Sequence, residues 1–187
     1  PLSQRIEMLD YMDRQIQGVL PPAPLPIHNQ DESRGPSAEQ TLLSGWPETL
    51  HALARLEPAD RTDVRIVLRQ ILQGQRSDLE RFGPPAAAPE IVRALASAAE
   101  LEAYTYAVAG CVGEFWSRVC RRHLFPRFVL DEATWMGRAS RFGQGLQLVN
   151  ILRDLASDLR QGRCYLPADE LASLGLQPVD LLDPIHW

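Results

Sequence analysis

One long predicted helix constrains the fold of this chain more than any other feature. Asp131 is a typical N-cap residue, the sequence from there to about Gln161 is predicted to be helical, and Gly162 is expected to end the helix. At about 1.5 Å per residue such a helix is on the order of 45 Å long, enough to cross a whole domain. Because strand-type alternation is missing from the rest of the chain, the sequence predicts an all-α fold.

Other helices are predicted from apolar periodicity and from residues that favour helix starts. Apolar residues recur every three or four positions in residues 3–20, which indicates an amphipathic helix. Capping boxes and first-turn prolines mark further starts, at Ser37 with Gln40, at Pro47 after Gly45, at Pro58, and at Ser97 with Glu100. We expect the helix from Pro58 to end at Gly74, residues 76–89 to form a break, and the helix from Ser97 to reach about Arg122.

The proline content separates one segment from the rest. Residues 21–36, PPAPLPIHNQDESRGP, predict a long Pro-rich surface loop. The remainder of residues 1–187 is expected to form a single domain. Because the chain opens inside a helical pattern without an initiator Met, and stops at PVDLLDPIHW where a new helix should start, we expect this domain to be incomplete at both ends.

Charge and cysteine content exclude several classes of protein. The 187 residues carry a net charge of −5, so there is no basic surface typical of nucleic-acid binding, and we expect no nucleic-acid partner. All 19 basic residues are arginine, whose planar guanidinium groups suit phosphate. Cys111, Cys120 and Cys164 form no Cys-x-x-Cys pair, so we expect reduced thiols in a cytoplasmic protein. No apolar run approaches the roughly 18 residues of a membrane span.

The stretch NILRDLASD, residues 150–158, carries the strongest chemical signal. Gln147, Asn150, Asp154 and Asp158 form one polar stripe on the long helix, and the two acids repel each other near the helix end where backbone carbonyls concentrate negative charge. The stripe is flanked by apolar residues, namely Leu146, Leu148, Val149, Ile151, Leu152 and Leu155. We therefore expect a helix buried over much of its surface, with the stripe facing inward or into a cleft.

Buried carboxylates have to be paired or bound to cations. Oxygen ligands from Asp and Asn suit Mg²⁺, which completes its shell with water and substrate phosphates. Arg153 and Arg163 are close enough in sequence to reach the same phosphates. The alternative is that these arginines form local salt bridges with Asp154 and Asp158, and the spacing alone favours that alternative.

Small residues gather on two of the predicted helices. They are Ala107, Ala109, Gly110 and Gly113 on one helix, and Gly143 and Gly145 on the other. Glycine costs about 1 kcal/mol in a helix relative to alanine, so its repeated use needs a reason. Two interpretations stay open, close packing of the two helices and an apolar channel for a long thin ligand. An apolar channel with a metal-binding polar end would suit an isoprenoid diphosphate.

Two stretches of this sequence resemble the squalene/phytoene synthase family. They are YTYAVAGCVG, residues 104–113, and GQGLQLVNILRDLASDLRQGRCYLPADEL, residues 143–171, and GQRSDLERF, residues 74–82, is also similar to a family segment. The resemblance implies an isoprenoid synthase-type helical bundle with a central cavity. It also implies a prenyltransferase that joins two prenyl diphosphates head to head with the help of Mg²⁺, through an allylic cation and a cyclopropyl intermediate.

The resemblance also implies roles for individual residues. Asn150, Asp154 and Asp158 match the positions that hold magnesium and diphosphate, and Gln147 and Arg153 match positions that line the same site. Tyr104 matches a tyrosine implicated in the cation chemistry. The segment after the aspartates contributes Arg163 and Tyr165 as further substrate-binding candidates.

One family motif was not found in this sequence. The family carries a first Asp-x3-Asp motif on a facing helix, whereas LDYMD gives Asp10 and Asp13 with a spacing of three. LDYMD resembles the family segment directly after the first motif, so we expect the motif itself to lie just upstream.

The leading hypothesis is condensation of two farnesyl diphosphates to presqualene diphosphate or squalene, with NADPH as the reductant if squalene is the final product. The alternatives are a phytoene synthase acting on geranylgeranyl diphosphate and a non-catalytic relative that acts as a scaffold or assembly factor. A terpene cyclase is disfavoured by the aspartates at both later positions of the stripe and by the GRCYLP segment. We expect prenyl diphosphates as partners, and peripheral contact with the inner face of the membrane for release of an insoluble product.

Overall fold

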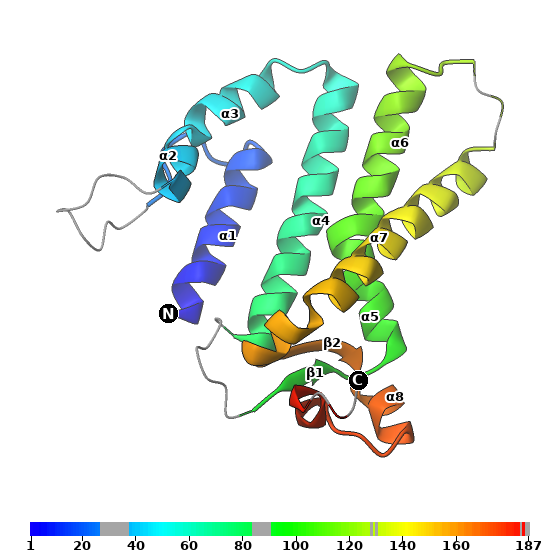
Figure 1. Ribbon diagram of the computed structural model, residues 1–187. Coiled ribbons are helices and arrows are strands. Elements are labelled where there is room, and N and C mark those ends of the chain that lie inside the picture. The colour runs from blue at the N-terminus through cyan, green and yellow to red at the C-terminus, as the bar shows by residue number, and fades with distance from the viewer. Residues whose placement is uncertain (27–37, 84–90, 128, 130, 184, 186–187) are drawn as a thin grey trace.

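The computed structural model describes residues 1–26, 38–83, 91–127, 129, 131–183 and 185, and this part of the chain is helical apart from one small sheet (Figure 1). The α-helices are α1 (Leu2–Ile16), α2 (Ala38–Ser44), α3 (Trp46–Ala54), α4 (Pro58–Phe82), α5 (Ala98–Thr105), α6 (Cys111–His123), α7 (Glu132–Arg160) and α8 (Ala168–Ser173). A π-helical segment, η1 (Tyr106–Gly110), joins α5 to α6, and a 3-10 helix, η2 (Pro178–Leu182), follows α8. The strands are β1 (Arg93–Leu95) and β2 (Arg163–Pro167). The predicted all-α class is confirmed.

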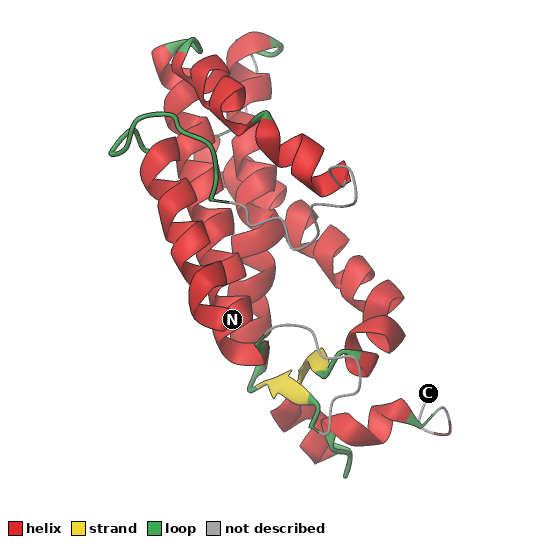
Figure 2. Ribbon diagram, turned by 90° about the vertical axis from the view of Figure 1, so that its left-hand side faces the viewer, coloured by secondary structure: helices red, strands yellow, loops and turns green. Residues whose placement is uncertain are grey.

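The long helices stand side by side. Helix α4 packs against α1 on one side and against η1 and α6 on the other, and α7 crosses η1 and α6 (Figures 1 and 2). Helix α3 closes the upper end, where the apolar side chains of Ile16, Leu50, Leu53 and Leu72 form one core cluster. The opposite end is closed by β1, β2, α8 and η2.

The longest predicted helix is confirmed. Asp131 accepts a hydrogen bond of 3.0 Å from the backbone N–H of Thr134, so it is the N-cap of α7. The helix ends at Arg160, and Gly162 has a φ of 82°, which turns the chain directly into β2. The short helix predicted at Pro47 is also present, with Gly45 as the N-cap of α3.

Helix α4 is longer than predicted. We expected it to end at Gly74, but it continues to Phe82, so the predicted break at 76–82 is wrong. A Cβ atom on Gly74 would lie 3.0 Å from the Cβ of Ala107 and 3.1 Å from Val108, so this glycine lets α4 approach η1 and does not stop the helix. The stop is Gly83, whose φ of 74° most side chains avoid.

The helix predicted from Ser97 to about Arg122 is present as α5, η1 and α6 in one continuous run. Ser97 accepts a hydrogen bond of 3.4 Å from Glu100 N–H, but the Glu100 carboxylate accepts from Ala96 N–H at 2.7 Å, one residue earlier than in a capping box. The π-helical turn falls on YAVAG. Such turns are frequent at functional sites.

The small sheet was not predicted. Strands β1 and β2 are parallel, and Arg93 is opposite Arg163. Leu95 and Cys164 are completely buried. Because β1 has three residues, it is too short to show the alternation that identifies a strand in sequence. Burial of its apolar side chains against α7 and α8 stabilises the strand.

Several sequence predictions fall partly outside the described residues. Residues 27–36 of the Pro-rich segment and Ser37 lie there, while residues 21–26 have no regular secondary structure. All three cysteines are free thiols. Within the described residues, none of the helices combines the length and apolar character that crossing a membrane requires.

Candidate active site

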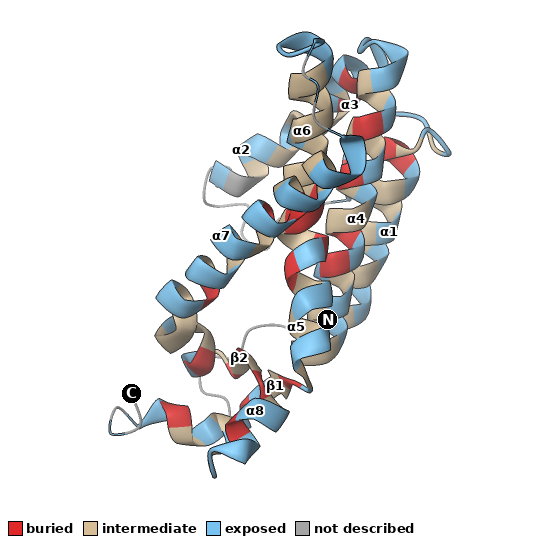
Figure 3. Ribbon diagram, turned by 90° about the vertical axis from the view of Figure 1, so that its right-hand side faces the viewer, coloured by how far each residue is buried: buried red, intermediate tan, exposed pale blue. Residues whose placement is uncertain are grey.

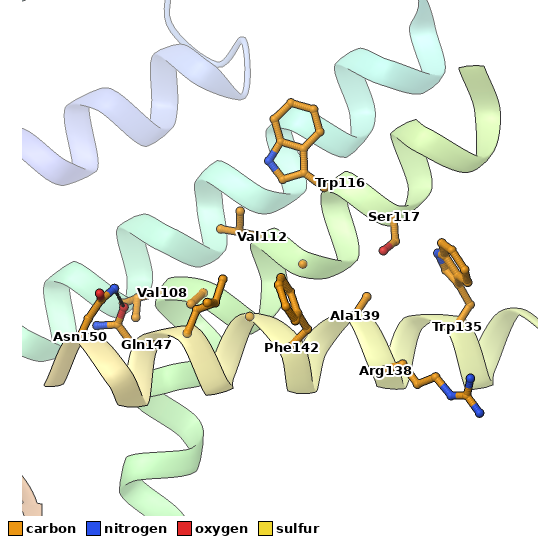
Figure 4. Close-up of a pocket in the computed structure, with 14 residues that line it drawn as sticks. Val108, Val112, Trp116, Ser117, Trp135, Arg138, Ala139, Phe142, Gln147 and Asn150 are labelled. Atoms are coloured by element: carbon orange, nitrogen blue, oxygen red, sulfur yellow. Dashed lines mark hydrogen bonds between the residues drawn. The ribbon is translucent and has the colours of Figure 1, made fainter. Parts of the chain in front are cut away.

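The main cavity lies between η1–α6 and α7 and has a volume of about 740 Å³ (Figure 4). Val108, Val112 and Trp116 contribute to one wall, and Phe142 and Leu146 to the other. Gln147 and Asn150 lie together at one end. The cavity is therefore an apolar space with an amide-bearing polar end, as the predicted channel requires.

The small residues serve close packing as well as the cavity. A Cβ atom on Gly113 would collide with the Ala139 carbonyl group, and one on Gly143 would collide with that of Ala109. Gly113 and Gly143 also line the cavity. Close packing is therefore confirmed for this pair, which also borders an apolar cavity, while binding of a long thin ligand there stays a prediction. Gly145 differs, because no atom lies within 4 Å of a Cβ built there.

The predicted burial of the helix that carries the stripe is wrong for part of its C-terminal half, although Leu159 near the helix end is completely buried. Ile151 is 4% exposed, but Leu148, Val149 and Leu152 are 41%, 61% and 63% exposed. Figure 3 shows this half of α7 standing away from α4 and α5. It contacts β2 and η2 at its end, and no described segment covers its outer side. The apolar residues that led to the prediction of burial therefore form an exposed surface in the described part of the chain.

The stripe itself runs along one side of α7 from the polar end of the cavity. The Asn150 amide donates a hydrogen bond of 3.4 Å to the Gln147 side-chain oxygen. Arg153 binds Asp154 through two bonds, Nε to Oδ1 at 2.9 Å and Nη2 to Oδ2 at 2.7 Å. The pKa of Asp154 is lowered by this arginine. The salt-bridge alternative is thus correct for Asp154, although an exposed pair of this kind adds little stability.

Asp158 is in a different environment. Its carboxylate makes no hydrogen bond or ion pair with any residue in the described part of the chain, although it is partly buried. Burial raises the pKa of Asp158, and the charge of Asp154 adds to the effect. Arg163 does not form the salt bridge with Asp158 that the alternative required. A partly buried carboxylate without a cation partner is suited to bind one.

Arg163 and Tyr165 instead meet a residue that the sequence did not indicate as part of the site, Asp78 of α4. Arg163 Nη1 lies 3.0 Å from Asp78 Oδ2, and Tyr165 OH donates to Asp78 Oδ1 at 2.7 Å. Burial and this carboxylate raise the pKa of Tyr165. The signal that could have found Asp78 is the family-like GQRSDLERF segment, but the helix was expected to end before it.

Tyr104 stacks on Tyr165 with ring centroids 4.7 Å apart. It does not line the main cavity. It lines a smaller one, of about 320 Å³, between α4 and α5. Burial raises the pKa of Tyr104, and Gln147 and Tyr165 lie within interaction range of its hydroxyl group. Gln147 therefore links the tyrosine pair to the polar end of the main cavity.

The donor groups present fit part of a magnesium site. No cluster of three or more His, Cys, Asp or Glu side chains close enough to hold a metal occurs among the described residues. The stripe offers the Asn150 amide oxygen and the carboxylates of Asp154 and Asp158. Because Mg²⁺ is commonly bound by one or two carboxylates, water and substrate phosphate, this donor set is sufficient for one side of its shell.

Asp10 and Asp13 lie on α1 and face α4. Their spacing of three is close to that of the Asp-x3-Asp motif that was not found. Asp10 pairs with Arg76, and Asp13 lies 3.7 Å from Arg69. Both are therefore engaged in ion pairs between helices.

Comparison with known proteins identifies the family of this chain. A model of the squalene/phytoene synthase family matches residues 3–186. The chain is 31% identical over 169 residues to the phytoene synthase of Arthrospira platensis, which covers 80% of the chain and 51% of that protein. It is 30% identical over 162 residues to the chloroplastic phytoene synthase 1 of Arabidopsis thaliana, covering 79% and 35%. Identity rises to 43% over 81 residues of the 15-cis-phytoene synthase of Enterobacter agglomerans, covering 43% and 25%.

The chain spans about half or less of the length of these relatives. The family match nevertheless includes every element that builds the candidate site, from α4 to β2. The chain belongs to the squalene/phytoene synthase family.

Proposed function

We propose that this protein is a Mg²⁺-dependent prenyltransferase that joins two geranylgeranyl diphosphates head to head to form phytoene. The observation that carries the proposal is the apolar cavity of about 740 Å³ whose polar end continues into the stripe of Asn150, Asp154 and Asp158. The relatives quoted above are named phytoene synthases. Their names favour the longer substrate over the farnesyl diphosphate of the leading sequence hypothesis.

The polar end would bind the diphosphate group. Asn150, Asp154 and Asp158 would hold magnesium, which supplies positive charge that stabilises the leaving diphosphate. Arg153 is exposed and pairs only with Asp154 in the described part of the chain, so it can turn toward a diphosphate with little loss. Gln147 would orient the same group from the cavity side.

The apolar walls would bind the prenyl chains and protect the reaction. Departure of diphosphate from one substrate leaves an allylic cation, which the double bond of the second substrate attacks. Loss of a proton then closes the ring of a cyclopropyl intermediate that still carries the second diphosphate. Val108 and Val112, which are partly buried, would help to exclude water that would otherwise quench the cation. The stacked rings of Tyr104 and Tyr165 lie beyond Gln147, where their π faces can stabilise positive charge.

The test is incubation of the full-length protein, in which we expect the first Asp-x3-Asp motif to be present, with Mg²⁺ and each prenyl diphosphate, followed by product analysis. We expect phytoene from geranylgeranyl diphosphate, without any requirement for NADPH. Presqualene diphosphate or squalene from farnesyl diphosphate as the sole product would restore the first hypothesis. A cyclic product from one substrate molecule would identify a cyclase. Absence of binding of Mg²⁺ with a non-reactive prenyl diphosphate analogue to the full-length protein would favour the scaffold alternative.

A further inference from the structure

We propose that Asp78 is a positioning residue of the candidate site, which holds Arg163 and Tyr165 in place and keeps the Arg163 guanidinium from pairing with Asp158. The inference rests on the proposed function in one respect, that Asp158 acts as a metal ligand. It is carried by the hydrogen bonds around Asp78, by the burial of the groups involved and by the unpaired state of Asp158.

The Asp78 carboxylate uses one oxygen for each partner. Oδ2 binds Arg163 Nη1 at 3.0 Å, and Oδ1 accepts from Tyr165 OH at 2.7 Å. The two partners are two positions apart on β2, so their side chains leave the same face of the strand. Cys164, between them, is completely buried in the core cluster on the other face. One carboxylate of α4 therefore binds two side chains on the same face of β2.

The remaining contacts of Arg163 also avoid α7. Its Nη2 donates to the Gly83 carbonyl oxygen at 3.1 Å, directly after the end of α4. Its Nε is buried and has no hydrogen-bond partner among the described residues. The Arg163 side chain is 14% exposed and that of Asp78 is 15% exposed, so water compensates little for a lost bond. The guanidinium is thus oriented by α4 and the residue directly after it.

Asp158 is the carboxylate with which Arg163 would otherwise pair. It lies within electrostatic range of both Arg163 and Asp78, yet it forms no ion pair with a described residue. A partly buried arginine that loses its only carboxylate partner is strongly destabilised and turns to the next one available. Without the charge of Asp78, Arg163 would pair with Asp158 and compete with a bound cation.

The second partner extends the effect of Asp78 to the tyrosine pair. Tyr165 stacks on Tyr104 and meets the Phe82 ring edge-on, with centroids 5.1 Å apart. The bond from Tyr165 OH to Asp78 fixes the position of the hydroxyl end of the ring in this stack. Asp78 therefore orients both the charged and the aromatic groups beside the stripe.

The test measures binding of Mg²⁺ in the presence of inorganic diphosphate by isothermal titration calorimetry. Asp78→Asn keeps the size of the side chain and an oxygen that can accept from Tyr165, but it removes the charge that holds Arg163. We expect this variant to bind Mg²⁺ about tenfold or more weakly, a typical effect for groups that position metal ligands.

A double variant makes the result specific. Asp78→Asn combined with Arg163→Gln leaves no guanidinium to pair with Asp158. We therefore expect its Mg²⁺ affinity to return to that of Arg163→Gln alone. The proposal is overturned if Arg163→Gln alone binds Mg²⁺ as weakly as Asp78→Asn, or if the double variant binds more weakly than Arg163→Gln alone.

Asp63→Asn is the matched control. Asp63 is also on α4 and pairs with Arg122 at 2.6 Å, but it lies about 22 Å along the helix from Asp78. We expect this variant to lower the melting temperature and leave Mg²⁺ binding unchanged. If Asp78→Asn behaves in the same way, its role is merely structural and the proposal is wrong.

The two proposals fail separately in this design. Because the titration contains no prenyl substrate, a parent protein that binds Mg²⁺ but makes no phytoene contradicts only the proposed function. Unchanged Mg²⁺ binding by Asp78→Asn overturns only the inference about Asp78, and a parent protein that binds no Mg²⁺ contradicts both.

Discussion

Asp154 and Asp158 are the same residue type on the same side of one helix, yet their surroundings make them chemically different. Asp154 is half-exposed and held by Arg153. Asp158 is partly buried, with its charge uncompensated by any hydrogen bond or ion pair in the described part of the chain. A bound cation should therefore stabilise Asp158 more than Asp154. At Asp154 a cation would only replace Arg153 as the positively charged partner.

The first prediction concerns stability without metal. Burial raises the pKa of Asp158 in the folded state above its ordinary value. A carboxyl with a raised pKa binds its proton more tightly when folded, so its ionisation destabilises the fold as the pH rises through that pKa. We expect Asp158→Asn to raise the melting temperature at neutral pH in EDTA and to abolish product formation.

Melting curves from about pH 3 to about pH 7 check this prediction. The gain should disappear below the ordinary pKa of a carboxyl, where Asp158 is protonated in both states. Asp154→Asn is the control with the opposite sign, because Arg153 lowers the pKa of Asp154. It should give no gain in stability. A lower melting temperature for Asp158→Asn at neutral pH would contradict the interpretation.

At the scale of helices, the crossing of α6 and α7 shapes the cavity. Gly113 lets α6 approach the α7 backbone at Ala139, and Gly143 lets α7 approach the η1 backbone at Ala109. Both glycines also line the cavity. The glycines therefore determine how closely the helices approach beside the cavity. The larger residues on either side of the glycines form the cavity walls.

Gly113→Ala is predicted to destabilise the protein. The new methyl group would meet the Ala139 carbonyl, which is backbone and cannot move aside cheaply. Overpacking of this kind costs about 1–3 kcal/mol. Gly145→Ala is the matched control on α7, because its methyl group meets nothing within 4 Å. It should stabilise the helix by up to about 1 kcal/mol. Urea unfolding measures both, and equal stability of the two variants would refute the packing argument.

Val112→Asp tests the apolar wall separately from the polar end. A carboxylate in this wall is costly to bury against a prenyl chain. We expect kcat/KM for geranylgeranyl diphosphate to fall at least about tenfold, equivalent to about 1.4 kcal/mol. Binding of Mg²⁺ with inorganic diphosphate should stay as in the parent, and Val112→Ile should retain activity. Equal losses in both assays would mean that the substitution disturbs the fold.

At the scale of the whole molecule, the site combines elements that are far apart in the chain. The stripe could be predicted because all its residues lie on one helix, where spacing alone determines which side they share. The bonds from Asp78 to Arg163 and Tyr165 span 85 and 87 residues, and no local pattern reports them. The exposure of Val149 and Leu152 was mispredicted for a related reason, since burial depends on neighbours in space.

The exposed face of α7 has a measurable effect on the chain by itself. Phe142, Leu146, Val149 and Leu152 are each more than half exposed. Contiguous apolar patches on soluble proteins promote association. We expect the 187-residue chain to self-associate with rising concentration in sedimentation experiments.

Replacing Val149 and Leu152 with glutamine should reduce that association. Leu124→Gln is the control, because Leu124 is also exposed, at 65%, but follows the C-terminal end of α6 and is not part of the α7 face. If all three substitutions reduce association equally, general surface hydrophobicity is responsible, and the α7 face has no special part. Peripheral contact with a membrane stays a prediction from the insolubility of the expected product.

The short parallel pair of β1 and β2 provides a reporter for the site in hydrogen exchange. The Arg93 N–H donates to the Gly162 carbonyl oxygen at 2.9 Å, directly before Arg163. Its protection from exchange therefore depends on how firmly β2 is held against β1. A change that frees β2 from α4 should speed exchange at Arg93 while the amides in the middle of α7 keep their protection. The amide lies outside the catalytic groups, so it can be followed in the resting protein, with no substrate present.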